Sequence, residues 1–501
     1  MEQVVRITTG QVRGDQHERV SRFLGIPYAA PAIGHARFEV PRPAPAWDGV
    51  RDATRHGPTA LQAPYAAPVD TLLPSSVDDG PDYLNVGVWT PDPGGSGLPV
   101  IVWFPGGAFV RGANSIATYD GTAFARDGVV MVGVNYRLGV AGFPVLPDAP
   151  TNLGIRDQIL ALQWVQENVA AFGGDPGNVT IMGESAGGMS VATLMAAPPA
   201  RGLFRRAIVQ SGGGSTVGDP DDLRRVVEEV AARLGVPTTA EALGQVAPEA
   251  LLEAQTAVGL ELALGPDPAR WGATTIRAGL GITGFFPCVD GEVVLGPPSE
   301  VITGGSTVPV PLLTGTTAEE FRLFVVPTGV AAAVTPEAMP LLAARYGWPA
   351  ELVERYSANR PDAPPGDVVA AILTDGAFRL PTVQLAEAAG AAGSTAHVYE
   401  FAWRTDLVAE LGACHALELG FVFDTLGREP GPTLVGPGAP QSLATEMHSA
   451  WVSFASTGDP GWAAYTPDRR AVMTFGVPSE VVVDPRGDER RAWAPLLAGR
   501  S

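Results

Sequence analysis

The chain has 501 residues, of which 46% are hydrophobic and 17% are charged. This length and composition are typical of a globular protein with a large core and exclude a disordered or fibrous chain. The formal charge of −20 at pH 7 disfavours nucleic acids, anionic membranes and strongly acidic substrates, because these partners need a basic surface. We therefore expect a neutral or cationic small-molecule substrate and no nucleic-acid partner.

The cysteine content and the first residues of the chain indicate the cellular compartment to expect. The only cysteines, Cys288 and Cys414, are far apart in the sequence, so we expect both to be reduced. Residues 1–6 lack the basic start and apolar core of a secretory signal, and no apolar run approaches the roughly 18 residues of a membrane span. These features predict a cytoplasmic protein without a membrane span, and they leave the oligomeric state open between a monomer and a small homo-oligomer.

The first half of the chain alternates short apolar runs with helical periods. Residues 99–104 and 129–134 are β-branched runs that predict strands buried on both faces. Residues 155–172 carry apolar side chains at helical spacing, and residues 178–183 predict another buried strand. This alternation predicts an α/β fold with a mostly parallel, twisted central sheet and helices on both faces.

From about residue 219 to residue 392 the pattern changes to amphipathic helices. We expect helices at 222–234 and 368–388, the second broken at Pro381. Strands at 308–314 and 396–403 return the chain to the sheet, and a helix at 442–456 lies near the end. The prediction is a single domain over 1–501, in which 219–392 form a mainly helical cap over the edge of the sheet that carries the active site.

One candidate nucleophile stands between the strand at 178–183 and a following helix. The sequence there is Gly183-Glu184-Ser185-Ala186-Gly187, and a G-x-S-x-G pattern in this setting is typical of a nucleophile elbow. An ordinary loop is the alternative, because chance matches are plausible in a chain with 61 glycines. If Ser185 begins the helix, the N-H of Ala186 and the helix dipole favour negative charge on the attacked oxygen.

A serine nucleophile needs a base and an acid that orients the base. In this arrangement the base follows the serine and the acid, which leaves His397, His415 and His448 as candidates. His415 lies in a loop of small residues and the other two lie inside a strand and a helix pattern, so position alone favours His415 only slightly. Glu319 and Glu320 follow the strand at 308–314 as candidate acids, and the pattern does not choose between them.

With these segments in order, the chain resembles the type-B carboxylesterase family of α/β-hydrolases, which includes bacterial esterases, animal carboxylesterases and cholinesterases. The most specific match is residues 172–188, Phe-Gly-Gly-Asp-Pro-Gly-Asn-Val-Thr-Ile-Met-Gly-Glu-Ser-Ala-Gly-Gly. Further matches lie at residues 23–29, 83–91, 135–139 and 457–460. The resemblance covers nearly the whole chain and is closest to the bacterial cytoplasmic type.

The resemblance implies a role for particular residues. It selects Glu320 as the acid, and because Phe321 replaces the usual glycine beside it, we expect the bulk of Phe321 to alter the path of the loop. It selects His415 as the base. It also implies that Glu184, Ser211 and Glu418 surround and brace the triad.

The resemblance also locates the oxyanion hole after the strand at 99–104. The donors by position are the N-H groups of Gly107, Ala108 and Ala186, which lie downstream of a proline, Pro105, that replaces the usual His or Tyr. Residues 60–82 contain no Trp to hold a quaternary ammonium, and Pro81 stands where secreted members have a cysteine. Both departures disfavour a choline esterase and a secreted form.

The implied function is hydrolysis of carboxylic esters through an acyl-enzyme on Ser185, without a cofactor or metal. The alternatives are an amidase or carbamate hydrolase with the same residues, and a non-catalytic binding or adhesion protein on the same fold. The nominated pocket residues, each of which is equally compatible with plain core, are Phe109, Phe285, Phe286, Phe324 and Phe421.

Overall fold

The computed structural model describes residues 3–17, 19–428 and 433–498. Its thirteen described strands form one sheet in the order β1-β2-β3-β5-β7-β6-β8-β9-β10-β11-β12-β13, with β4 paired to β2. The strands are β1 (Gln3–Ile7), β2 (Gly10–His17), β3 (Val20–Pro27), β4 (Val50–Asp52), β5 (Asn85–Thr90), β6 (Leu98–Phe104), β7 (Val130–Val134), β8 (Gly174–Glu184), β9 (Arg206–Gln210), β10 (Leu312–Thr317), β11 (Ala396–Phe401), β12 (Ala471–Phe475) and β13 (Glu480–Val483).

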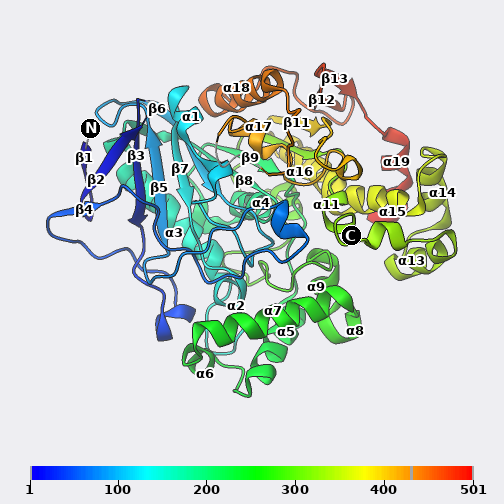
Figure 1. Cartoon of the computed structure of the whole chain (residues 1–501), viewed down its shortest axis with the longest axis horizontal. Helices are drawn as coiled ribbons and strands as arrows, with labels where there is room; N and C mark the ends of the chain where they lie inside the picture. Colours follow the sequence, from blue (N-terminus) through cyan, green and yellow to red (C-terminus); the bar gives the residue numbers. More distant parts are fainter. Residues whose placement is uncertain (1–2, 18, 429–432, 499–501) are drawn as a thin grey trace.

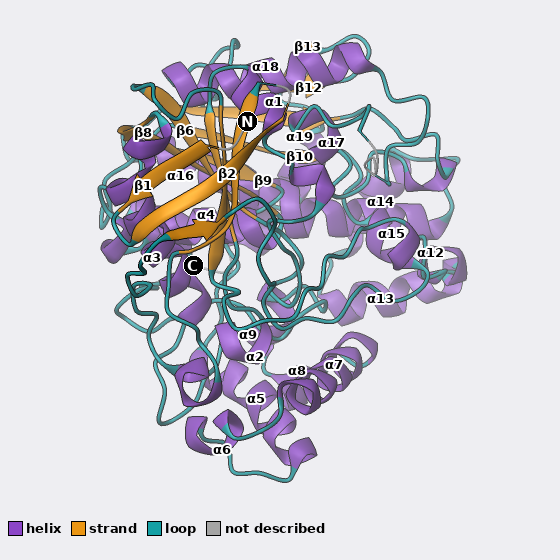
Figure 2. Cartoon of the chain, turned by 60° about the vertical axis from the view of Figure 1, so that its left-hand side comes forward, coloured by secondary structure: helices purple, strands orange, loops and turns teal. Residues whose placement is uncertain are grey.

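The centre of the sheet is parallel and its two ends are antiparallel. Every neighbouring pair from β7 through β6, β8, β9, β10 and β11 to β12 is parallel. The pairs from β1 to β7 along the sheet order and the pair of β12 with β13 are antiparallel. Helices surround the sheet in Figure 2, so the predicted mostly parallel sheet with helices around it is confirmed.

The helices come from every part of the chain. They are α1 (Thr122–Arg126), α2 (Gly139–Gly142), α3 (Leu153–Asn168), α4 (Ala186–Ala196), α5 (Pro220–Leu234), α6 (Ala240–Gly244), α7 (Pro248–Leu264), α8 (Pro268–Trp271), α9 (Ala273–Ala278), α10 (Pro298–Thr303), α11 (Arg322–Val325), α12 (Val330–Ala333), α13 (Met339–Tyr346), α14 (Ala350–Ala358), α15 (Pro365–Thr374), α16 (Leu380–Ala391), α17 (Leu419–Val422), α18 (Gln441–Thr457), α19 (Gly487–Ala492) and α20 (Ala494–Ala498). In Figures 1 and 2 α5 to α9 form one group at the bottom, and α13 to α15 lie together on the right.

The strand expected at 308–314 begins later than predicted. β10 covers Leu312–Thr317, because Pro309 and Pro311 have no N-H to donate to a neighbouring strand. The helix expected at 155–172 is α3 followed by a tighter turn at Val169–Phe172. Helix ends commonly tighten in this way, because hydrogen bonds between residues three apart, rather than four, satisfy the last carbonyls of the helix.

The helix break expected at Pro381 does not occur. Residues 365–391 form one helical run, in which a π turn at Asp375–Arg379 immediately precedes Pro381 in the first turn of α16. The wider turn places the missing N-H of Pro381 where a helix start tolerates it. By length and composition this run could also cross a bilayer, but 67% of its most apolar stretch is buried inside the protein.

The sheet is buried on both faces. In β6, Val100 and Val102 belong to one hydrophobic cluster, whereas Ile101 and Trp103 belong to a second cluster on the opposite face. Alternate side chains of a strand point to opposite faces, so β6 is covered on both sides. The neighbouring strand β8 is covered in the same way, and its carboxyl end therefore has a rigid support.

Candidate active site

Ser185 lies in the sharp turn that joins β8 to α4. Its backbone has φ 55° and ψ −124°, a strained conformation for a residue with a side chain, and its N-H donates to the carbonyl of Gln210 at 2.9 Å. The glycines beside it permit close packing. A Cβ on Gly187 would lie 1.9 Å from the carbonyl oxygen of Phe104 in β6, and a Cβ on Gly183 would lie 2.4 Å from the Gly187 backbone.

His415 contacts a buried carboxylate, as an orienting acid requires. Its Nδ1 lies 2.6 Å from Oε2 of Glu320, and both side chains are almost fully buried. The other oxygen of Glu320 accepts hydrogen bonds from Ser211 Oγ at 2.6 Å and from the Thr317 N-H at 2.8 Å. Every oxygen of Glu320 is therefore engaged, which fixes the direction of the imidazole.

The alternative acid and bases lie in other surroundings. Glu319 is partly exposed, forms ion pairs with Arg322 and Arg404, and accepts a hydrogen bond from the Ala413 N-H. His448 contacts the carbonyl of Val422 at 2.7 Å through Nδ1. His397 is buried in β11, where its ring packs near two aromatic rings. Nε2 of His448 also lies 3.2 Å from a carboxylate oxygen, Oδ2 of Asp127, but of the three candidate bases only His415 lines the cavity that Ser185 lines.

Phe321 does not displace Glu320. Its φ of −72° lies in the ordinary helical range, so the position does not need the conformational freedom of glycine. The Phe321 N-H donates to Thr374 Oγ1 at 3.0 Å, and the ring packs against Phe324 and Phe378. The added bulk enters an aromatic cluster beside the acid loop.

Two further buried glutamates lie near His415. Oε1 of Glu184 is 3.1 Å from His415 Nε2, although the angles do not form a hydrogen bond, and Oε1 of Glu418 accepts one from Gln210 Nε2 at 3.2 Å. Burial raises the pKa of Glu184 to about 7 and that of Glu418 to about 8. Burial lowers the pKa of His415, but the charges of Glu184 and Glu320 raise it more, to about 9.

Ser185 and His415 line the same cavity but do not touch through a hydrogen bond. Among the described residues Ser185 Oγ has no hydrogen-bond partner, and His415 Nε2 faces Glu184 instead. Hydrogen bonds between a nucleophile and its base are often formed only when substrate is bound. Both side chains line the same cavity.

The loop after β6 presents free backbone N-H groups. Within the described chain, the N-H groups of Gly107 and Ala108 donate to no acceptor, and Ala108 and Phe109 have φ values of 56° and 60°. Ala186 is the first residue of α4, where the N-H has no partner within the helix. Pro105 lies upstream, and its carbonyl accepts a hydrogen bond from Tyr136 at 2.8 Å. The loop therefore has a strained backbone, is held by the hydrogen bond from Tyr136, and presents backbone N-H groups that have no acceptor in the described chain.

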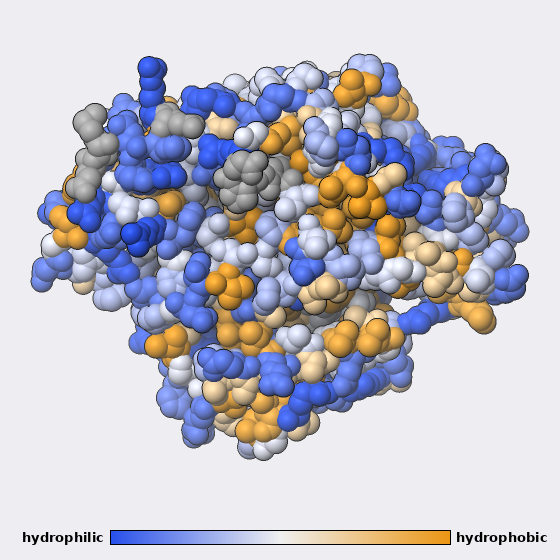
Figure 3. All heavy atoms as spheres, viewed as in Figure 1, coloured by the Kyte–Doolittle hydropathy of each residue, from blue (hydrophilic) through white to orange (hydrophobic). Residues whose placement is uncertain are grey.

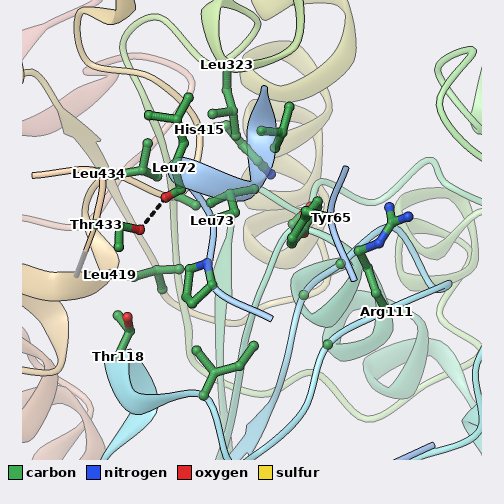
Figure 4. Close-up of a pocket in the computed structure, with 18 of the residues that line it drawn as sticks. Tyr65, Leu72, Leu73, Arg111, Thr118, Leu323, His415, Leu419, Thr433 and Leu434 are labelled. Atoms are coloured by element: carbon green, nitrogen blue, oxygen red, sulfur yellow. Dashed lines mark hydrogen bonds between the residues drawn. The ribbon is translucent and has the colours of Figure 1, made fainter. Parts of the chain in front are cut away.

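The cavity over Ser185 has a volume of about 290 Å³. Figure 4 shows Leu72, Leu419 and Leu434 on one side, with Tyr65 and Arg111 on the other. Of the five nominated phenylalanines only Phe324 lines this cavity, where its ring centroid lies 5.2 Å from that of His415. The other four, Phe109, Phe285, Phe286 and Phe421, are buried in the core and do not line it.

Several cavity residues that the sequence did not single out come from the loops before β5 and after β6. Tyr65, Leu72 and Leu73 lie between β4 and β5, and the sequence there has no helical or strand periodicity. Arg111 is four residues after Gly107 in the predicted oxyanion loop, and this short distance was the available signal. In Figure 3 hydrophobic residues gather near the middle of the face, around α11 and α17, which also contribute to the cavity.

The described part of the chain contains no group of three or more His, Cys, Asp or Glu residues arranged to hold a metal ion. The buried glutamates instead face His415, Ser211 and Gln210.

Comparison with known proteins gives a consistent result. A model of the carboxylesterase family matches residues 1–488. The para-nitrobenzyl esterase of Bacillus subtilis (strain 168) is 35% identical over 508 residues, which cover 98% of this chain and 99% of the relative. Human carboxylesterase 3 is 34% identical, over 92% of this chain and 84% of the relative.

Solved structures agree with the family match. The carboxylesterase Est55 of Geobacillus stearothermophilus superposes with a TM-score of 0.85 at 38% identity, covering 98% of this chain and 99% of that one. A structure of PNB esterase gives a TM-score of 0.83 at 32% identity, with coverage of 98% and 99%. The chain therefore belongs to the carboxylesterase family and is a carboxylic-ester hydrolase with the α/β-hydrolase fold.

Proposed function

We propose that this protein hydrolyses carboxylic esters through an acyl-enzyme on Ser185, with His415 as the base and Glu320 as the acid that orients it. The observation that carries the proposal is the buried contact of Glu320 with His415 Nδ1 in the wall of a cavity that also exposes Ser185. The strained turn at Ser185 supports it, because such strain is common at catalytic positions.

In the first step His415 Nε2 takes the proton of Ser185 Oγ while the oxygen attacks the ester carbonyl carbon. The carbonyl oxygen becomes an oxyanion that accepts hydrogen bonds from Gly107, Ala108 and Ala186. Loss of one such donor typically costs about 3 kcal/mol of transition-state stabilisation. The carbon-oxygen bond to the alcohol then breaks, and the alcohol leaves with the proton from His415.

In the second step water attacks the acyl group and gives a proton to His415. The bond from the acyl carbon to Ser185 breaks, the carboxylic acid leaves, and the proton returns to Ser185. Glu320 keeps the proton of the neutral imidazole on Nδ1, so that Nε2 faces the serine in both steps. Ser211 supports this by donating to Glu320.

We also propose that residues 219–392 act as a cap that shapes the cavity. Support comes from Ile282, Leu323 and Phe324, which lie within this stretch and line the cavity. The cavity walls are mostly apolar, and an apolar pocket discriminates weakly between chain lengths. We expect turnover of several alkyl and aryl esters of moderate size.

Amides and carbamates are the competing substrates, because the same residues can attack them. Matched p-nitrophenyl butyrate, butyryl p-nitroanilide and a p-nitrophenyl carbamate separate the three activities. We expect the ester to be turned over fastest and Ser185→Ala to remove nearly all turnover, because no other residue replaces the nucleophile. Steady-state release of p-nitrophenol or p-nitroaniline measures this, and ester turnover that survives in Ser185→Ala would overturn the proposal.

For the cellular setting we propose a cytoplasmic monomer or small homo-oligomer that requires no cofactor and binds no nucleic acid. The two buried, unpaired thiols of Cys288 and Cys414 support a reducing compartment. Fractionation of the producing cells and sedimentation of the purified chain test the location and the oligomeric state.

A further inference from the structure

The wall of the cavity carries one fixed charge. Among the described residues that line it, Arg111 is the only Arg, Lys, Asp or Glu side chain, and the remaining surface is largely apolar. A cation next to apolar surface is costly to leave without a partner, because it is partly removed from water. The donors of the partly buried Arg111 must therefore be satisfied by the protein, by water or by a ligand.

Most of the Arg111 guanidinium has no partner in the protein. Nε donates a long hydrogen bond of 3.4 Å to the carbonyl of Ala63, and the group stacks over the Tyr65 ring at 4.7 Å from its centroid. The terminal nitrogens have no hydrogen bond or ion pair within the described chain. A guanidinium has five N-H donors, so four remain for a ligand.

The surroundings hold this guanidinium in place. Gln62 accepts a hydrogen bond from the Gly112 N-H at 2.8 Å and donates to the Gly112 carbonyl at 3.1 Å, which ties the segment before Tyr65 to the loop that carries Arg111. The stacked ring restricts the plane of the guanidinium. A pre-oriented planar fork with two free ends suits a carboxylate, which it can bind through two parallel hydrogen bonds.

We propose that Arg111 binds a free carboxylate of the substrate, so that the enzyme prefers acidic esters such as monoesters of dicarboxylic acids over neutral esters of the same size. The ester group then lies over Ser185, with the carboxylate at the Arg111 and Tyr65 side of the cavity in Figure 4. The opposite side, with Leu72, Leu419 and Leu434, receives the apolar part of the substrate. This inference rests on the proposed ester hydrolysis at Ser185 and names its substrate class.

The net charge of −20 acts against an acidic substrate only at long range. Exposed charges are largely screened beyond about 8 Å at physiological salt, whereas Arg111 would contact the carboxylate directly. No carboxylate is among the described residues that line the cavity, so nothing there competes for Arg111. The local charge therefore opposes the expectation of a neutral or cationic substrate that follows from composition.

The test compares two ester pairs that differ mainly in charge. p-Nitrophenyl hydrogen glutarate and p-nitrophenyl methyl glutarate place the charge in the acyl group, whereas 4-carboxybenzyl butyrate and 4-methylbenzyl butyrate place it in the alcohol. We expect wild-type kcat/KM to favour the acidic member of at least one pair. Arg111→Gln should lower kcat/KM for that acidic ester by about 10- to 100-fold, mostly through KM, and change the neutral ester by less than about threefold.

Two variants serve as controls. Arg111→Lys keeps the charge without the planar fork, so it should retain an intermediate preference. Arg42→Gln removes a charge from an exposed ion pair with Glu39, and we expect it to leave both preferences unchanged. It therefore reports any effect of net charge alone.

Two outcomes would overturn the role of Arg111. In the first, the wild type has no higher kcat/KM for the acidic ester in either pair. In the second, Arg111→Gln lowers kcat/KM equally for the acidic and the neutral member of a pair. Both outcomes leave the proposed ester hydrolysis intact provided that neutral esters are turned over and Ser185→Ala abolishes this turnover. Absence of Ser185-dependent turnover would instead overturn the proposed function itself.

Discussion

Three buried glutamates surround the imidazole of His415, and their contacts differ. Glu320 binds Nδ1 and has all its oxygens engaged, whereas Glu184 faces Nε2, the nitrogen that takes the serine proton in the proposed mechanism. Glu418 accepts a hydrogen bond from Gln210 and makes none with His415 within the described chain. A carboxylate at Nε2 stabilises the protonated imidazole, which raises the pKa of His415 and lowers the fraction of neutral imidazole that can accept a proton at neutral pH.

This contact predicts a shift in the pH profile of Glu184→Gln. Burial raises the pKa of Glu184, whereas the charges of Glu184 and Glu320 raise the pKa of His415, so an ionised Glu184 favours the protonated imidazole. A neutral glutamine removes that charge, so the pKa of His415 falls. The acidic limb of kcat/KM should then move to lower pH by about one unit or more.

Glu418→Gln is the matched control for this shift. It also removes a buried carboxylate, but one whose charge has a smaller effect on the pKa of His415. Its acidic limb should therefore move less than that of Glu184→Gln. A limb that stays in place or moves to higher pH in Glu184→Gln, with activity retained, would show that Glu184 does not control the base.

At the scale of secondary structure, the junction of β8 with α4 depends on close contact with the neighbouring strands. Gly187 and Gly183 are packed so tightly that a side chain would overlap backbone atoms of β6 and of the junction itself. Backbone atoms cannot move aside without disturbing the sheet. The glycines of the G-x-S-x-G pattern thus have a packing reason that is independent of catalysis.

Gly187→Ala tests this packing. The added Cβ would lie 1.9 Å from the Phe104 carbonyl, so we expect the free energy of unfolding to fall by about 3 kcal/mol and kcat to fall as Ser185 is displaced. Urea unfolding followed by tryptophan fluorescence measures the first effect, and ester turnover measures the second.

Gly259→Ala is the control for the loss of a glycine in a helix. Gly259 lies inside α7, and an added Cβ there meets no atom within 4 Å. This variant should gain about 0.5 to 1 kcal/mol, because alanine is the better helix former. Equal stability changes in the two variants would contradict the packing argument.

At the scale of the whole molecule, a buried ion pair joins segments that are far apart in the sequence. Arg137 binds both oxygens of Asp157 in α3, and both side chains are at most 1% exposed. The same guanidinium donates to the carbonyls of Arg37 and Glu39, near the start of the chain. One side chain therefore links the N-terminal segment, the stretch after β7 and α3.

Arg137→Met should destabilise the whole domain by about 3 to 5 kcal/mol, because it leaves the Asp157 carboxylate buried without its partner. We expect a lower midpoint of urea unfolding, with fluorescence and circular dichroism changing together. In contrast, Arg224→Gln breaks an exposed pair with Asp221 and should cost less than about 1 kcal/mol. Similar losses in the two variants would contradict a special role for the buried pair.

The sequence by itself determined the fold class, the central strands and the position of the strand-to-helix turn at Ser185, because these depend on short-range patterns. Buried strands require continuous apolar residues, as in residues 99–104 and 129–134, and the elbow requires glycines at fixed distances from the serine. The sequence predicted the ends of helices and strands less well. The predicted start of β10 ignored the effect of two prolines, and the predicted helix break at Pro381 ignored the π turn that carries the helix through this residue.

Tertiary structure decided which side chains meet. Glu319 and Glu320 are adjacent in sequence, yet only Glu320 turns inward to His415, because β10 and the following loop set the direction of each side chain. Four of the five nominated phenylalanines lie in the core, since hydrophobic residues fill cores and cavity walls alike. The pairing of Arg111 with Tyr65 arises from two loops 46 positions apart that the fold brings to one wall, and no local pattern encodes such a contact.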